Sequence, residues 1–105
     1  MKIYHANCGF RDERSLVLVT DENSSKPLEH HEQHSPDGHS WGYEGSGPSE
    51  LAKDILWDLL EKKPSNDLYQ TFKRDFVALW PQDEGWMITE DQIRQSFHEE
   101  VNDGA

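Results

Sequence analysis

The spacing of apolar residues differs between the two halves of this chain: short apolar runs in the first half predict strands, and helical spacing in the second half predicts helices. Residues 2–8 and 15–20 are short runs rich in β-branched and aromatic residues, separated by Gly9 and a polar segment. This arrangement predicts an antiparallel β-hairpin. Residues 16–19 are all apolar, which indicates a strand covered on both faces. A polar turn follows, and residues 28–31 are expected to form a third short strand.

Helical periodicity dominates the second half of the chain. Residues 49–63 and 66–80 repeat apolar side chains at intervals of three and four, which predicts two amphipathic helices. The short apolar run 86–88 predicts one more strand. The sequence Thr-Glu-Asp-Gln at 89–92 matches a capping box and predicts the start of a third helix. The acidic tail from about residue 100 is expected to fray.

The order of these elements predicts an α+β fold. A small antiparallel sheet, made of the N-terminal hairpin and one or two short strands, should pack with three helices. The chain has 105 residues, which suits a single domain over residues 1–105. Four Trp, four Phe and three Tyr supply enough bulky side chains for a modest core.

Charge narrows the classes of ligand. The chain holds 21 acidic and 10 basic residues and carries a formal net charge of −11 at pH 7. Such a field repels nucleic-acid phosphates and anionic membranes and attracts basic protein grooves. A protein partner is therefore favoured over nucleic acid or membrane. The alternative is that the acidity only keeps a small protein soluble.

The single cysteine and the lack of long apolar runs bear on the cellular compartment in which the protein is expected. Cys8 has no partner for an intramolecular disulfide, which suits a reducing environment. No apolar run is long enough for a signal peptide or a membrane span. We therefore expect a cytoplasmic protein.

Carboxylates recur along one side of the first predicted helix. Glu50, Asp54, Asp58 and Glu61 are spaced by three or four residues, so they should align roughly 5–6 Å apart. Trp57 lies among them as an aromatic anchor. Carboxylates at this spacing can imitate the phosphates of a duplex, so we interpret these five residues as a partner-binding surface. The alternative is an ordinary solvated helix face.

Residues 34–48, HSPDGHSWGYEGSGP, form a glycine- and proline-rich loop that leads into a helix N-terminus. Such a loop can hold an anion, but the spacing matches neither a Walker motif nor a dinucleotide fingerprint, and Glu44 would repel phosphate. We favour a tight turn that packs aromatic side chains against the core. The residues of this loop motif are His34, Ser35, Trp41, Tyr43, Gly45, Ser46 and Gly47.

Histidines gather beside carboxylates just before and within this loop. Imidazole and carboxylate are good ligands for Zn²⁺ or Ni²⁺, but the spacing matches no strong zinc signature. No metal site, cofactor or catalytic residue is therefore predicted, and a binding protein is favoured over an enzyme. A small-ligand or metal-binding protein built on residues 34–48 stays open as the alternative. The residues concerned are His30, His31, His34 and His39, with Glu29, Glu32 and Asp37.

The stretch HSPDGHSWGYEGSGPSELAKDIL resembles an uncharacterised family of short phage, plasmid and bacterial proteins. That family is expected to show a His-Ser-Pro turn, then Trp-Gly-Tyr-Gly-Gly-Ser-Gly-Pro, then a helix. Here Glu44 replaces a glycine and His39 an aromatic residue. The segment LYQTFKRDFVALWP and the closing W-x-I-T look similar too. The resemblance implies a shared fold and an origin in a mobile genetic element.

The acidic net charge, the carboxylates along the first predicted helix and the family resemblance together lead to one functional hypothesis. Small acidic proteins of mobile elements often inhibit host defence complexes by covering a basic surface. We therefore hypothesise an inhibitor of the anti-CRISPR type, acting in the host bacterial cytoplasm on a partner with a basic nucleic-acid-binding groove.

Overall fold

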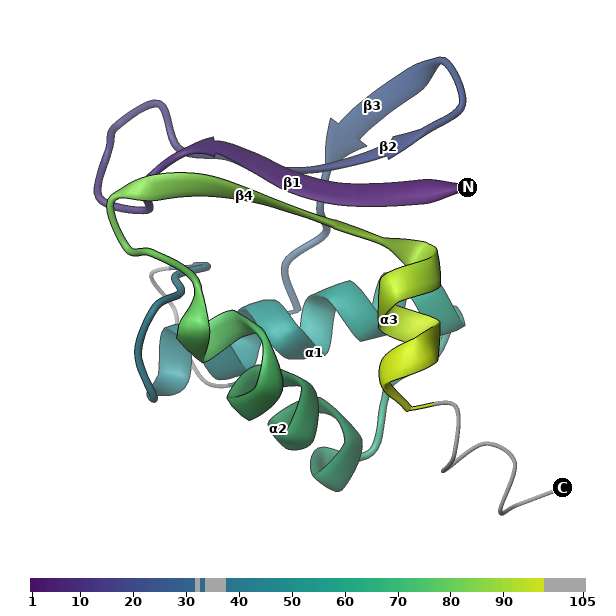
Figure 1. Ribbon diagram of the computed structural model, residues 1–105. Coiled ribbons are helices and arrows are strands. Elements are labelled where there is room, and N and C mark those ends of the chain that lie inside the picture. Colours follow the sequence, from purple (N-terminus) through teal and green to yellow (C-terminus); the bar gives the residue numbers. More distant parts are fainter. Residues whose placement is uncertain (32, 34–37, 98–105) are drawn as a thin grey trace, which may run out of the picture.

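The computed structural model describes residues 1–31, 33 and 38–97, which form a four-stranded sheet above a layer of helices (Figure 1). The predicted α+β class is confirmed. The elements in chain order are β1 (Lys2–Cys8), β2 (Val17–Asp21), β3 (Ser24–Pro27), α1 (Ser46–Leu60), α2 (Asn66–Asp75), the 3₁₀ helix η1 (Val77–Leu79), β4 (Glu84–Thr89) and α3 (Glu90–Ser96).

The sheet has the strand order β3-β2-β1-β4, and all neighbouring strands are antiparallel. β1 is central: Tyr4 lies opposite Val19 of β2 on one side and opposite Ile88 of β4 on the other. The helices α1 and α2 lie between β3 and β4 in the sequence, and Figure 1 shows them together on one face of the sheet.

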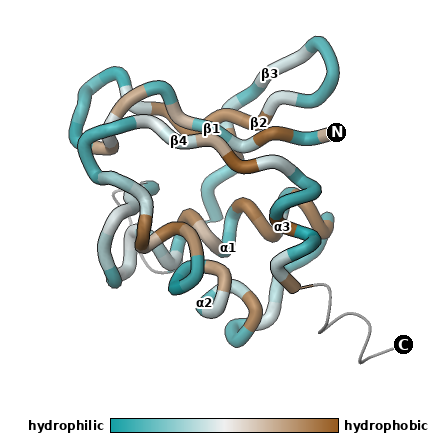
Figure 2. The backbone as a smooth tube through the Cα atoms, in the orientation of Figure 1, coloured by the Kyte–Doolittle hydropathy of each residue, from teal (hydrophilic) through white to brown (hydrophobic). Residues whose placement is uncertain are grey.

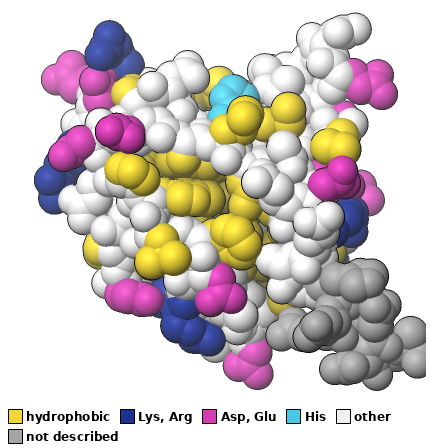
Figure 3. All heavy atoms as spheres, in the orientation of Figure 1, with side chains coloured by type: hydrophobic (Ala, Val, Ile, Leu, Met, Phe, Trp, Pro, Cys, Tyr) yellow, Lys and Arg dark blue, Asp and Glu magenta, His cyan; other side chains and the backbone are white. Residues whose placement is uncertain are grey.

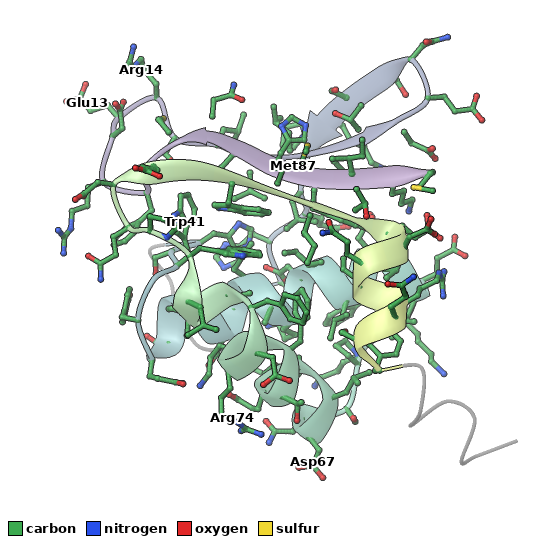
Figure 4. All side chains as sticks on the ribbon, viewed as in Figure 1. Glu13, Arg14, Trp41, Asp67, Arg74 and Met87 are labelled. Atoms are coloured by element: carbon green, nitrogen blue, oxygen red, sulfur yellow. The ribbon has the colours of Figure 1, made fainter. Side chains whose placement is uncertain are left out.

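The strands alternate between a buried face and an open face. Tyr4, Val19 and Ile88 point to the helices and are buried, whereas Met87 points to the other side (Figure 4) and keeps 65% of its surface exposed. The expectation that residues 16–19 are covered on both faces is wrong. Leu16 is exposed, because in the part of the chain that the structure describes the helices pack on one face only.

The third strand lies earlier than predicted. β3 covers Ser24–Pro27 rather than residues 28–31, because the turn at Glu22 and Asn23 is tight and pairs Thr20 directly with Ser25. Glu22 adopts a left-handed backbone conformation in this turn, with φ 54°. Leu28 leaves the strand but donates its N–H to the carbonyl of Val17 and buries its side chain.

Helix α1 is the central helix of the fold. It spans Ser46–Leu60, three residues ahead of the predicted range at both ends, and every residue from 47 to 56 is buried. Hydrophobic and hydrophilic stretches alternate along its backbone (Figure 2), and the apolar side chains of Leu51 and Ile55 are fully buried. Gly47 is needed for close packing, since a Cβ there would come 1.7 Å from Ser40 Oγ.

The remaining helices are short and well capped. α2 ends at Asp75 and continues as η1, so residues 66–80 are not one helix as predicted. Ser65 caps α2 by accepting from Leu68 N. The predicted capping box of α3 is confirmed: Thr89 Oγ1 accepts from Gln92 N at 3.2 Å, and Gln92 Oε1 accepts from Thr89 N at 2.9 Å.

Aromatic side chains fill the space between the two layers. Trp41 is fully buried beneath β4 (Figure 4), and its Nε1 donates to the carbonyl of Pro81 at 3.0 Å. Trp86 packs edge-on against Trp41 and stacks on Trp80 at 4.2 Å between ring centroids. On the face of the molecule seen in Figure 3, hydrophobic side chains lie across the middle and charged groups lie around the margin. Among the described residues, no helix has the length and apolar character needed to cross a membrane.

Candidate functional site

Three charged side chains of α1 lie inside the molecule. Glu50, Lys53 and Asp54 are all at most 1% exposed. They occupy one side of the helix, where four described residues of the preceding chain contact them: His30, His31, Gln33 and His39, here called the covering segment. Burying charges is unfavourable unless they are paired and hydrogen-bonded, so the partners of these groups decide what the site can do.

Partners of the Glu50 carboxylate among the described residues include an ammonium, a backbone N–H and an imidazole. Lys53 Nζ lies 2.7 Å from Oε1, while the backbone N–H of Gln33 donates to Oε2 at 2.8 Å and His30 Nε2 lies 2.9 Å from the same oxygen. Lys53 also donates to the carbonyl of His31. One buried ammonium therefore ties the helix to the covering segment.

Asp54 has a separate set of partners one helical turn further on. His39 Nε2 lies 2.6 Å from Oδ2, and the backbone N–H of His31 donates to Oδ1 at 3.2 Å. The rings of His30 and His39 meet edge-on at 5.1 Å between centroids. Two carboxylates thus face one ammonium and two imidazoles in a single cluster.

The same cluster contains a set of atoms that can hold a metal ion. One ring nitrogen each from His30 and His39 and a carboxylate oxygen of Asp54 all lie within 4.8 Å of one another. His39 and Asp54 are shielded from solvent, whereas His30 is exposed on one side. Two imidazoles and a carboxylate form a ligand set typical of zinc.

A polar pocket of about 250 Å³ opens beside this cluster. The ring of Trp57 forms part of its lining and stacks on His31, with 3.7 Å between ring centroids and an angle of 3°. Asp58, on the same helix, accepts from Tyr4 OH at 2.7 Å and from Lys2 Nζ at 3.1 Å. The lining residues are Lys2, Lys26, Glu29, His31, Asp54, Trp57, Asp58 and Glu61.

Tyr4, which donates to the lining residue Asp58, has a shifted pKa. Burial raises the pKa of its phenol well above the ordinary value, and the hydrogen bond to the Asp58 carboxylate adds to the shift. The phenol therefore stays protonated and keeps donating to Asp58. Asp58 is in this way fixed to β1 from within the molecule.

The structure separates the five predicted partner-binding residues. Glu50 and Asp54 are buried, so the expectation of an exposed strip is wrong for these two, because His30, His31, Gln33 and His39 contact them. Trp57 and Asp58 are half-buried, and Glu61 is exposed. Four of the five, all except Glu50, line the pocket beside the cluster.

The glycine loop is a packing element in the part that the structure describes. Trp41 is buried, and Tyr43 is partly exposed with its hydroxyl 2.8 Å from Ser40 Oγ. Gly45 is the N-cap of α1, and the helix itself begins at Ser46 and Gly47. The other two motif residues, His34 and Ser35, lie outside the described residues, as do Glu32 and Asp37.

Sequence reasoning missed the role of Lys53. Lys53 and Asp54 stand between Leu51-Ala52 and Ile55-Leu56. This spacing also fits a solvated pair on an amphipathic helix, so the local sequence carries no signal of their burial. His30 and His39 were recognised as part of a histidine group, but their carboxylate partners on α1 were not.

Comparison with known proteins places the chain in a family. The model of DUF6166, a family of unknown function, matches residues 5–99, so the chain belongs to this family. This finding confirms the predicted relationship to a domain of unknown function. Neither the curated proteins nor the solved structures gave a match.

Proposed function

We propose that this protein binds and inhibits a partner protein through that partner's basic, nucleic-acid-binding surface. The observation that carries this proposal is the pocket lined by Asp54, Trp57, Asp58 and Glu61. It brings carboxylates and an aromatic ring together where a cationic side chain can enter. Such a pocket is complementary to an arginine or lysine of the partner.

The charge of the pocket supports a cationic ligand. Four carboxylates line it against two ammonium groups, and one of these, Lys2 Nζ, already lies 3.1 Å from the Asp58 carboxylate. Glu29 and Glu61 are the exposed acids at its rim. The net charge of −11 adds a long-range field that would speed the approach of a basic partner.

Trp57 gives the pocket a rigid wall. Its stacking on His31 holds the indole in one orientation, so little side-chain entropy is lost when a ligand docks. Tryptophan is also the best aromatic partner for a cation. An arginine inserted here would pack along the indole and bridge to the carboxylates at the rim.

Inhibition follows from the identity of the surface that is bound. A basic residue held by this pocket cannot at the same time contact a phosphate of DNA or RNA. The acidity of the chain and the resemblance of its glycine loop to proteins of mobile elements favour a host defence complex, of the kind that anti-CRISPR proteins block, as the target.

An affinity capture with matched bait variants tests this proposal. The wild-type protein, Glu29→Lys/Glu61→Lys, and Glu13→Lys/Glu22→Lys are each used as bait in lysate of a defence-competent bacterium, at low and high salt. The two double variants have equal net charge, and all four side chains are exposed. We expect a nucleic-acid-handling protein that releases as salt rises and binds the pocket variant about tenfold more weakly.

The control pair decides between a specific pocket and bulk charge. The Glu13/Glu22 variant should retain the partner nearly as well as the wild type, because these residues lie in the loops at the ends of β2 rather than at the pocket. Equal losses in both variants would contradict the assigned pocket. Absence of any salt-sensitive partner would contradict the proposed function.

A further inference from the structure

We propose that His30, His39 and Asp54 form a binding site for one divalent transition-metal ion, with Zn²⁺ as the favoured ion. The metal site shares Asp54 with the proposed protein-binding pocket, but its three ligand atoms face one another rather than the pocket rim. It differs also from the metal site considered in the glycine loop, since two of its three ligands lie outside residues 34–48.

The three ligand atoms come from separate parts of the chain and meet in one place. His30 follows β3, His39 precedes the glycine turn, and Asp54 lies in the middle of α1, yet their ligand atoms are all within 4.8 Å of one another. A tetrahedral zinc ion holds its ligands roughly 3.3 Å apart, given zinc–ligand distances of about 2.0–2.1 Å. His39 and Asp54, at 2.6 Å, need to move apart only slightly to admit the ion.

The chemistry of the donors selects the ion. Imidazole nitrogen together with carboxylate oxygen suits Zn²⁺, Ni²⁺ and Cu²⁺, whereas Mg²⁺ and Ca²⁺ prefer oxygen ligands alone. Three protein ligands also leave a coordination position open, as in zinc sites that bind water or a further ligand. Glu50, 2.9 Å from His30 Nε2, is placed to orient that imidazole, as carboxylates do beside metal-binding histidines.

The charges of the cluster also favour a bound cation, because two buried carboxylates share one buried ammonium. Glu50 and Asp54 are both fully shielded from solvent, and Lys53 pairs with Glu50 rather than with Asp54. Among the described residues, the carboxylate of Asp54 therefore has an imidazole and a backbone N–H as partners and no ammonium. A dication beside Asp54 would supply the positive charge that this end of the cluster lacks.

Calorimetry with ZnCl₂ on tag-free protein tests the site. We expect one ion per chain, with affinity reduced at least tenfold in His39→Ala and in His30→Ala. His5→Ala is the matched control: His5 lies on β1 with Nε2 2.8 Å from Thr20 Oγ1, away from the cluster, and its loss should leave affinity unchanged. Absence of binding, or equal binding by all four proteins, would overturn the proposal.

Two readouts on the wild-type protein guard against a variant that fails to fold. Saturating Zn²⁺ should raise the midpoint of thermal unfolding by a few degrees, because the ion binds the native state. Co²⁺ should give the intense visible bands of a four-coordinate site rather than the weak spectrum of the hydrated ion. No thermal shift together with a hydrated-ion spectrum would overturn the proposal, whatever the outcome of the partner capture.

Discussion

The two halves of α1 carry the same pattern of carboxylates in opposite surroundings. Glu50 and Asp54, which lie between the start and the middle of the helix, are fully buried and bound to histidines and a lysine. Asp58 and Glu61, which continue the same spacing, lie at the edge of an open pocket. Spacing along a helix determines which residues share a side, whereas burial depends on what another part of the chain places over that side.

The covering segment explains the difference. Between β3 and α1, the described residues His30, His31 and His39 contact the charged groups in this part of the helix. The chain at Ser40 can approach the helix closely because Gly47 has no side chain to keep it away. The second half of α1 instead faces Tyr4 and Lys2 of β1, which reach only as far as Asp58.

The largest expected effect comes from removing the one ammonium of the buried half. Lys53→Met leaves the Glu50 carboxylate without its ammonium partner, and an uncompensated buried charge costs about 3–5 kcal/mol. Urea unfolding followed by circular dichroism would measure this loss. The matched control, Lys62→Met, changes an exposed residue just beyond the same helix and should alter stability by less than about 0.5 kcal/mol.

This first pair of variants also tests whether the two halves of α1 differ as described. Similar stabilities for Lys53→Met and Lys62→Met would mean that water reaches Glu50 and Lys53. The distinction between a buried and an open half would then be wrong, and the metal site would lose its shielded environment.

The next largest loss of stability is expected when the carboxylate of Glu50 is neutralised, and the same change at Glu61 is its matched control. Glu50→Gln removes the charge that Lys53 and His30 bind, and hydrogen bonds to a charged group contribute about 1.5–3 kcal/mol. The loss should be smaller than for Lys53→Met, because the Gln amide oxygen can still accept from Lys53, which also keeps its bond to the His31 carbonyl. Glu61→Gln changes an exposed carboxylate and should stay within about 0.5 kcal/mol of the wild type. Thermal unfolding of both variants at pH 7 gives the comparison, and equal midpoints would contradict it.

Much of the fold was predictable from local pattern. The hairpin of β1 and β2, the helical periodicity of α1 and α2, and the capping box of α3 each depend on residues close together in sequence. Boundaries were less accurate where tertiary contacts decide them. α2 gives way to η1 after Phe76, for example, although apolar residues continue at helical spacing to Trp80.

The site was only partly predictable, because it depends on long-range packing. Four of the five residues expected from the carboxylate spacing line one pocket: Asp54, Trp57 and Asp58 of α1, and Glu61, its C-cap residue. Nothing local shows that His30 and His39 fold back onto Glu50 and Asp54, 15 to 20 residues away in sequence. The contact exists only once the segment before α1 is packed.

The smallest expected effect concerns the link between β1 and the open half of α1. Tyr4→Phe removes the hydrogen bond to Asp58, and we expect a loss of about 1.5 kcal/mol at pH 7. The pH dependence sharpens the test. Because the pKa of Tyr4 is raised in the folded protein, folding favours the protonated phenol, and this contribution is fully present below the ordinary tyrosine pKa of 10.0.

Above that pH the unfolded chain loses the phenol proton while the native protein keeps it, so the stability of the wild type should fall as pH rises. Tyr69 also has a raised pKa through burial and contributes in the same direction. Tyr4→Phe should therefore show a shallower alkaline decline than the wild type without abolishing it. Urea unfolding at pH 8 to 11 measures both slopes. Parallel slopes would mean that Tyr4 ionises freely, and Asp58 would then be held to β1 by Lys2 alone.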